Sequence, residues 1–267
     1  MKINNLDFNM QISGEGTPFI WAHGLMSSME GEDMLDWFDW QNFPKNIKLI
    51  RYDARGHGKS QGSEKPEDYH WRNLGKDMLA VGEAVGAKQF IAGGTSMGCA
   101  TTIYAALQAP ERMKAILLVT PPTGWETRAA QGKLYKQFAM IGGLLGGKGL
   151  AKMMSGNMAR MLPAWMVESK PEMFTGMVEG MNALKRKTMW NVMRGAAVTD
   201  MPPREEFKAL VDIPTIILAW VGDPTHPTST AEELHRLLPK SDLFIAQGYE
   251  EFKTIPQRLK DFVLKYA

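Results

Sequence analysis

Short apolar runs alternate with longer segments of mixed polarity over most of the chain. The runs are bounded by Gly, Pro or charged residues, which is typical of buried strands in a largely parallel sheet. These runs are Pro18–Ala22, Ile47–Tyr52, Phe90–Ala92, Ile116–Thr120, Thr215–Val221 and Leu243–Ala246. Helices are predicted at Asn73–Val85, Met97–Gln108, Ser229–Leu238 and Pro256–Tyr266. Strands that alternate with helices predict an α/β fold, with a mostly parallel sheet flanked by helices.

Residues 121–212 interrupt this alternation. The segment has no convincing strand pattern, holds twelve of the twenty methionines, and is divided by Gly and Pro residues into what we expect to be several helices. We interpret it as a helical insertion between two strands of the sheet. The chain is then one core domain, residues 1–120 and 213–267, that carries the insertion at 121–212.

The composition is that of an ordinary globular protein, and it argues against several kinds of site. The 31 basic and 29 acidic residues give a net charge of +2, which argues against a surface built for nucleic acid or an anionic membrane. Cys99 is the only cysteine, so the chain has no internal disulfide and no metal site built from several cysteines. Ligand-spaced histidine pairs and phosphate-binding loops are absent, so we expect neither a metal nor a cofactor.

The N-terminal sequence does not look like a targeting segment. Polar residues interrupt it throughout, and no stretch of the chain approaches the roughly 18 apolar residues that a membrane helix needs. We therefore expect a cytoplasmic protein, because a reducing compartment suits a single thiol.

The sequence Gly94-Thr95-Ser96-Met97-Gly98 carries the clearest chemical signal. It is a G-x-S-x-G pattern that follows a predicted strand and opens a predicted helix. Such a turn holds the serine in a strained conformation, so small residues are needed two positions to either side. The backbone N–H of Met97, at the start of the helix, can stabilise an oxyanion. We therefore predict that Ser96 is a nucleophile.

Two further elements precede this pentapeptide. His23-Gly24-Leu25 follows the first predicted strand, and Tyr-Asp-Ala-Arg-Gly-His-Gly-Lys-Ser at residues 52–60 follows the second. With the Ser96 pentapeptide, their order and separations make the chain resemble the α/β-hydrolase superfamily over nearly its whole length. The resemblance implies an α/β-hydrolase fold, a helical cap formed by residues 121–212, and a second oxyanion-hole amide at Leu25.

The resemblance also implies a catalytic acid and a catalytic histidine. The family's acid commonly follows the strand equivalent to Thr215–Val221, four residues before a proline, and Asp223 occupies that place. The alternative is that Asp223 only initiates an Asp-Pro turn. The family's histidine normally follows the last strand in a Gly-His pair, and here that place holds Tyr249. A base is still required, because a free serine is a weak nucleophile.

His226 is the strongest candidate for that base. It lies three residues after Asp223, on a loop that we expect at the same carboxyl edge of the sheet as Ser96. Open α/β sheets place their sites at this edge. The alternative is a loop histidine packed against Pro227 or the insertion. The other four histidines are expected to be positional or exposed: His23 and His57 in the two family-like turns, and His70 and His235 on helices.

Tyr249 has two interpretations. It blocks the pocket and marks an inactive member of the family, or it is a hydrogen-bond donor or weak base beside the serine. The methionine-rich insertion favours an adaptable apolar pocket, although such side chains also form helix cores. The candidate pocket residues are His23, Tyr249, Trp125 and Trp165, with Phe174 and Trp190 as further walls.

These observations predict a serine hydrolase that cleaves a small apolar ester or related acyl substrate. Ser96 attacks the carbonyl, His226 transfers the proton, and Asp223 orients the imidazole. One alternative is a non-catalytic member that binds a small molecule. Another is C–C bond hydrolysis, acyl transfer or cofactor-free oxygen chemistry on the same scaffold. The haloalkane dehalogenase branch is disfavoured, because its nucleophile is an aspartate.

Overall fold

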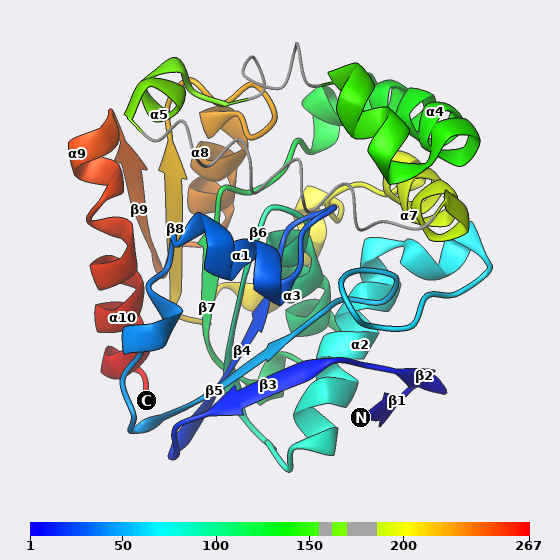
Figure 1. Cartoon of the computed structure of the whole chain (residues 1–267). Coiled ribbons are helices and arrows are strands. Elements are labelled where there is room, and N and C mark those ends of the chain that lie inside the picture. Colours follow the sequence, from blue (N-terminus) through cyan, green and yellow to red (C-terminus); the bar gives the residue numbers. More distant parts are fainter. Residues whose placement is uncertain (155–161, 170–185) are drawn as a thin grey trace.

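The computed structural model describes residues 1–154, 162–169 and 186–267 (Figure 1). Its main sheet has seven strands in the order β3-β5-β4-β6-β7-β8-β9. Their bounds are β3 Met10–Ser13, β4 Thr17–Ala22, β5 Ile47–Tyr52, β6 Phe90–Thr95, β7 Met113–Val119, β8 Thr215–Trp220 and β9 Ser241–Ala246. Among these described strands only β3, at one edge, pairs antiparallel with its neighbour. The predicted α/β fold is therefore confirmed, and each of the six predicted runs lies largely within one strand.

The predicted strand Phe90–Ala92 is shorter than the observed strand β6. The strand runs on through Gly93 and Gly94 to Thr95, although glycine is usually unfavourable in a strand interior. A Cβ atom at Gly93 would lie 3.1 Å from the Trp21 ring and 3.2 Å from the Phe19 ring. Side chains of the neighbouring strand therefore occupy the space that a larger residue in β6 would need.

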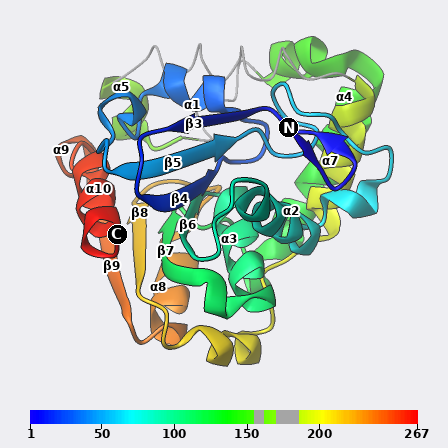
Figure 2. The same cartoon turned by 90° about the horizontal axis from the view of Figure 1, so that it is seen from below.

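Each face of the sheet has its own layer of helices, as the view from below shows (Figure 2). Helices α2 (Trp71–Ala84), α3 (Met97–Gln108) and α8 (Thr228–Leu237) cover one face, and α9 (Tyr249–Phe252) and α10 (Ile255–Lys265) cover the other. Side chains of β4 alternate between the two cores, with Ile20 in the first and Phe19 and Trp21 in the second. This alternation follows from the two-residue period of a strand.

Several short elements complete the core. They are β1 (Lys2–Ile3), β2 (Leu6–Asp7), α1 (Met29–Leu35) and the 3₁₀ turns η1 (Trp40–Asn42), η2 (Pro66–Tyr69), η3 (Pro110–Arg112), η4 (Trp125–Thr127) and η6 (Arg204–Leu210). Across the described ranges, no helix has the length and apolar character needed to cross a membrane.

The described part of residues 121–212 is helical and contains no strand. It includes α4 (Arg128–Met154), α5 (Ala164–Ser169) and α7 (Arg186–Val198). Helix α4 breaks at Gly146, whose φ of 71° lies in the left-handed region that favours glycine. A small separate core joins α4 to α7 through Phe138, Leu150, Met189 and Met193. In Figure 1, α4 and α5 lie at the end of the molecule toward which β8 and β9 point.

Candidate active site

Ser96 occupies a strained turn between β6 and α3. Its φ of 53° and ψ of −113° lie outside the ordinary regions for a residue with a side chain, and such conformations cost about 1–3 kcal/mol. A Cβ atom at Gly98 would lie 2.0 Å from the carbonyl oxygen of Ala22, and one at Gly94 would lie 2.6 Å from the same oxygen. The two glycines therefore let β4 approach the turn closely enough to hold Ser96 in this conformation.

The hydroxyl of Ser96 contacts an imidazole from the loop that follows β8. Nε2 of His226 lies 2.7 Å from Oγ of Ser96. The other ring nitrogen, Nδ1, lies 2.8 Å from Oδ2 of Asp223. A neutral imidazole with its proton on Nδ1 donates to the carboxylate and accepts the serine proton at Nε2. The three sequence-predicted residues thus form one continuous hydrogen-bonded chain.

Asp223 is 7 % exposed, and its two oxygens have different partners. Oδ2 faces the His226 ring, whereas Oδ1 accepts from the backbone N–H of Thr225 at 2.9 Å, from the Thr225 hydroxyl at 2.7 Å and from the backbone N–H of His226 at 3.1 Å. Burial alone would raise the pKa of Asp223. The charge and hydrogen bond of His226, together with the bonds from Thr225, outweigh burial and lower the pKa to about 2.

The two backbone amides expected to form an oxyanion hole lie in segments that border Ser96. Met97 follows Ser96 directly, and Leu25 follows Gly24, where a Cβ atom would lie 3.5 Å from Cβ of Ser96. Neither the N–H of Leu25 nor that of Met97 donates to another group in the described part of the chain.

His23 fixes the direction of one of these amides. Its Nε2 accepts the backbone N–H of Ala54 at 2.9 Å, so the ring proton is on Nδ1 and is donated to the carbonyl of Gly24 at 2.7 Å. The N–H of Leu25 belongs to the same trans peptide unit as that carbonyl and points the opposite way. His23 is only 1 % exposed, and burial lowers its pKa. The ring is therefore neutral and holds the peptide between Gly24 and Leu25 in place, and it is not a wall of a pocket.

The remaining histidines have no described contact with Ser96. His57 is buried beside His23, and burial, followed by the neighbouring His23, lowers its pKa to about 3. His235 is exposed and contacts Ser241, as predicted for a solvated helix position. His70 was expected to be exposed, but it is half-buried at the N-terminus of α2, where its ring caps the N–H of Arg72. The difference arises because the end of the insertion packs against this terminus through Thr199.

Tyr249 lies away from the serine hydroxyl. Its ring stacks on Phe252 with centroids 6.3 Å apart, and it lines a separate cavity of about 340 Å³ together with Trp37 and Lys260. No described hydrogen bond joins Tyr249 to Ser96 or His226. The place at which the family's histidine was expected therefore does not contribute to this hydrogen-bonded chain.

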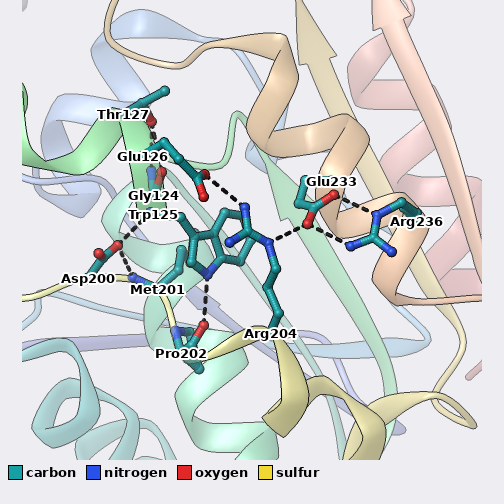
Figure 3. Close-up of polar contacts among 10 residues, drawn as sticks. All are labelled: Gly124, Trp125, Glu126, Thr127, Asp200, Met201, Pro202, Arg204, Glu233 and Arg236. Atoms are coloured by element: carbon teal, nitrogen blue, oxygen red, sulfur yellow. Dashed lines mark hydrogen bonds and ion pairs between the residues drawn. The ribbon is translucent and has the colours of Figure 1, made fainter.

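The predicted pocket tryptophans have different surroundings. The indole N–H of Trp165 donates to the carbonyl of Val221 at 3.1 Å, so α5 contacts the start of the loop that carries Asp223 and His226. The indole N–H of Trp125 instead donates to the carbonyl of Pro202 at 2.9 Å, within the polar cluster at the two ends of the insertion (Figure 3). Trp190 packs against the α4–α7 core, and Phe174 lies outside the described residues.

Thr225 is a part of the site that the sequence argument missed. The signal was available as the spacing Asp-x-Thr-His, in which a hydroxyl stands between the two titratable residues.

In the described residues, no group of three or more His, Cys, Asp or Glu side chains is arranged to hold a metal. The hydrogen-bonded chain of Ser96, His226 and Asp223 can itself supply proton transfer and nucleophilic attack.

Comparison with known proteins supports this fold. Residues 17–142 match a family model described as the alpha/beta hydrolase fold. A curated relative from Klebsiella pneumoniae (strain 342), named "Putative carbamate hydrolase RutD", is 24% identical over 195 residues, which cover 73% of this chain and 70% of that protein.

Two solved structures are similar over nearly the whole chain. One is a malate-bound thermophilic esterase from Thermogutta terrifontis, with a TM-score of 0.79 and 18% identity, covering 98% of this chain and 93% of that one. The other is an enol-lactonase from Burkholderia xenovorans LB400, with a TM-score of 0.75 and 16% identity, covering 100% and 98%. Sheet order, motif order and the family model agree, and the chain has the α/β-hydrolase fold.

Proposed function

We propose that this protein is a serine hydrolase that cleaves a carboxylic ester or related acyl compound through an acyl-enzyme on Ser96. The observation that carries the proposal is the unbroken chain from the Ser96 hydroxyl through the His226 ring to the Asp223 carboxylate, with donor–acceptor distances of 2.7 and 2.8 Å. These distances are within the reach that general-base catalysis requires.

In the first half-reaction, Oγ of Ser96 attacks the acyl carbon while Nε2 of His226 takes the hydroxyl proton. The imidazolium that forms is stabilised by Asp223, which remains ionised because its pKa is about 2. The N–H groups of Leu25 and Met97 stabilise the negative charge on the carbonyl oxygen. His226 then returns its proton to the leaving group, and the acyl group stays on Ser96.

In the second half-reaction, His226 takes a proton from water, and the resulting hydroxide attacks the acyl carbon of the ester on Ser96. Collapse of this intermediate releases the carboxylic acid, and the proton returns to Oγ of Ser96. The same two steps apply to any substrate with an activated acyl carbon. An ester, a lactone and a carbamate all have one, so the names of the similar proteins are consistent with this reaction class.

We also propose that residues 121–212 form a cap on a core made of residues 1–120 and 213–267. Two contacts support this division. Leu25, which carries a proposed oxyanion amide, and Met26 pack against the α4–α7 core, and Trp165 of α5 contacts the loop after β8. The apolar α4–α7 core beside Leu25 favours a substrate whose acyl portion is apolar.

A fluorophosphonate probe tests the function, because it reacts with an activated serine without requiring a known substrate. The wild type should be labelled at Ser96, and Ser96→Ala should not be labelled. His226→Gln should be labelled at least about 10³-fold more slowly, in line with the cost of removing a triad base. Labelling of Ser96→Ala at the wild-type rate would refute the proposal. An unlabelled wild type combined with labelling of Tyr249→His would favour a degenerate binding protein.

A further inference from the structure

The geometry of the site depends on a residue that need not contact substrate. We propose that Thr225 is a positioning residue, whose hydroxyl holds the Asp223 carboxylate and the His226 ring in the direction that leaves Nε2 free to accept from Ser96. This inference rests on the proposed function. The juxtaposition that carries it is the Thr225 hydroxyl, 2.7 Å from Oδ1 of Asp223 and 3.0 Å from Nδ1 of His226.

An acid and a base only three residues apart pose a geometric problem. The backbone must turn sharply so that both side chains face each other, while Nε2 of His226 still reaches Ser96 on another loop. The backbone N–H groups of Thr225 and His226 both donate to Oδ1 of Asp223, at 2.9 and 3.1 Å, and this Asx-type turn provides the bend. These backbone bonds hold Oδ1 of Asp223 but do not contact the His226 ring itself.

The Thr225 hydroxyl links the carboxylate to the ring. A hydroxyl has one proton, and a carboxylate oxygen can only accept, so the proton of Thr225 lies on the bond to Oδ1 of Asp223. Oδ2 of Asp223 requires a proton on Nδ1 of His226, and the hydroxyl oxygen of Thr225 is a second acceptor at the same nitrogen. These two acceptors hold the ring so that the lone pair on Nε2 lies beside the Ser96 hydroxyl.

The side chain of Thr225 can be altered without removing the turn. Thr225→Val keeps the shape of the side chain and both backbone N–H donors but removes the hydroxyl. Thr225→Ser keeps the hydroxyl and removes only the methyl group. The pair therefore separates hydrogen bonding from packing, and Ser96 and His226 themselves are unchanged.

The test measures labelling rate and ring tautomer in the whole protein. The fluorophosphonate rate constant of Thr225→Val should fall about 10- to 100-fold, the range expected for the loss of a hydrogen bond to a charged group, whereas Thr225→Ser should stay within about threefold of wild type. In protein with ¹⁵N-labelled histidine, the neutral His226 ring should have its proton on Nδ1 in the wild type and in Thr225→Ser. In Thr225→Val its nitrogen shifts should differ from those of the wild type, because Nδ1 loses one of its two acceptors.

Three results would overturn the inference while the wild type is still labelled at Ser96. Thr225→Val could match the wild type in both rate and ring nitrogen shifts. Thr225→Ser could be as slow as Thr225→Val, which would assign the effect to the methyl group. Thr225→Val could be slow although its ring nitrogen shifts match those of the wild type. A wild type that is not labelled at Ser96 would instead refute the proposed function.

Discussion

His226 lies 2.8 Å from Asp223, a residue only three positions earlier on the same loop. The turn between them allows the loop after β8 to supply both the carboxylate and the imidazole. The segment after β9 supplies neither of these two groups. The ring also reaches Ser96, which is 130 residues away in sequence. The His226 ring therefore contacts one residue that is close in sequence, Asp223, and one that is distant in sequence, Ser96.

The first prediction concerns Tyr249, which occupies the place of the family's usual histidine. Because its ring stacks on Phe252 and has no described bond to Ser96 or His226, Tyr249→Phe should label at Ser96 within about threefold of the wild-type rate. His226→Gln, measured in parallel, should lose nearly all labelling. If Tyr249→Phe is as impaired as His226→Gln, then the tyrosine hydroxyl belongs to the proton pathway.

The second prediction concerns the turn that holds Ser96. Gly98→Ala should destabilise the fold by more than about 3 kcal/mol or prevent folding, because its Cβ atom would lie 2.0 Å from the backbone oxygen of Ala22. Gly248→Ala is the matched control, since nothing lies within 4 Å of its Cβ position and its φ of −179° is extended. Thermal unfolding followed by circular dichroism measures both. Equal unfolding midpoints for the two variants would contradict the steric argument.

The third prediction concerns the cluster that joins both ends of the insertion to α8 (Figure 3). The Arg204 guanidinium pairs with Glu126 at 2.8 Å and with Glu233 at 2.5 Å, and it lies 4.7 Å from the centre of the Trp125 ring. Arg204→Gln should lower the thermal unfolding midpoint in low salt, and this difference should shrink in 1 M NaCl, because salt screens exposed ion pairs.

Lys240→Gln removes a single exposed pair with Asp212 and provides the control. It should change the midpoint less than Arg204→Gln, because an isolated surface pair contributes little. A deficit in Arg204→Gln that is the same at both salt concentrations would show that its charge pairs are not responsible for the loss.

The fourth prediction concerns the pH dependence of stability. Glu32 is buried, and both its carboxylate oxygens accept from the indole N–H of Trp21 at 3.0 and 3.1 Å. Burial raises its pKa to about 7, although Arg51 acts in the opposite direction. With a folded-state pKa above the ordinary 4.5, the folded protein binds more protons than the unfolded chain between about pH 4.5 and 7. The contribution of Glu32 to stability is therefore lost as the pH rises through that window.

Glu32→Gln should remove this part of the pH dependence, so that its stability relative to wild type increases from pH 5 to pH 7.5. Urea unfolding at several pH values measures the difference. Glu15→Gln, which changes an exposed carboxylate, should follow the wild-type profile. A Glu32→Gln profile parallel to wild type over the same range would contradict a raised pKa at Glu32.

Much of the fold follows from local patterns. The apolar runs around Ile20, Ile50 and Leu218 were predicted as strands because buried parallel strands need continuous apolar sequence, and each lies in the sheet. The end of β6 was missed because its glycines have no strand preference of their own. The place of Gly93 depends on the Phe19 and Trp21 rings of the adjacent strand, and that of Gly94 depends on the Ala22 carbonyl of the same strand.

The sequence by itself determined most strands of the sheet, its helices and the serine turn, because strand and helix periodicity and the small residues on either side of Ser96 are properties of short segments. Only the tertiary structure decided that His226, and not Tyr249, contacts Ser96. A hydrogen bond needs two atoms within about 3 Å. That distance depends on the order of β6, β7 and β8 in the sheet and on the turn at Thr225, which directs the His226 ring toward the Ser96 hydroxyl.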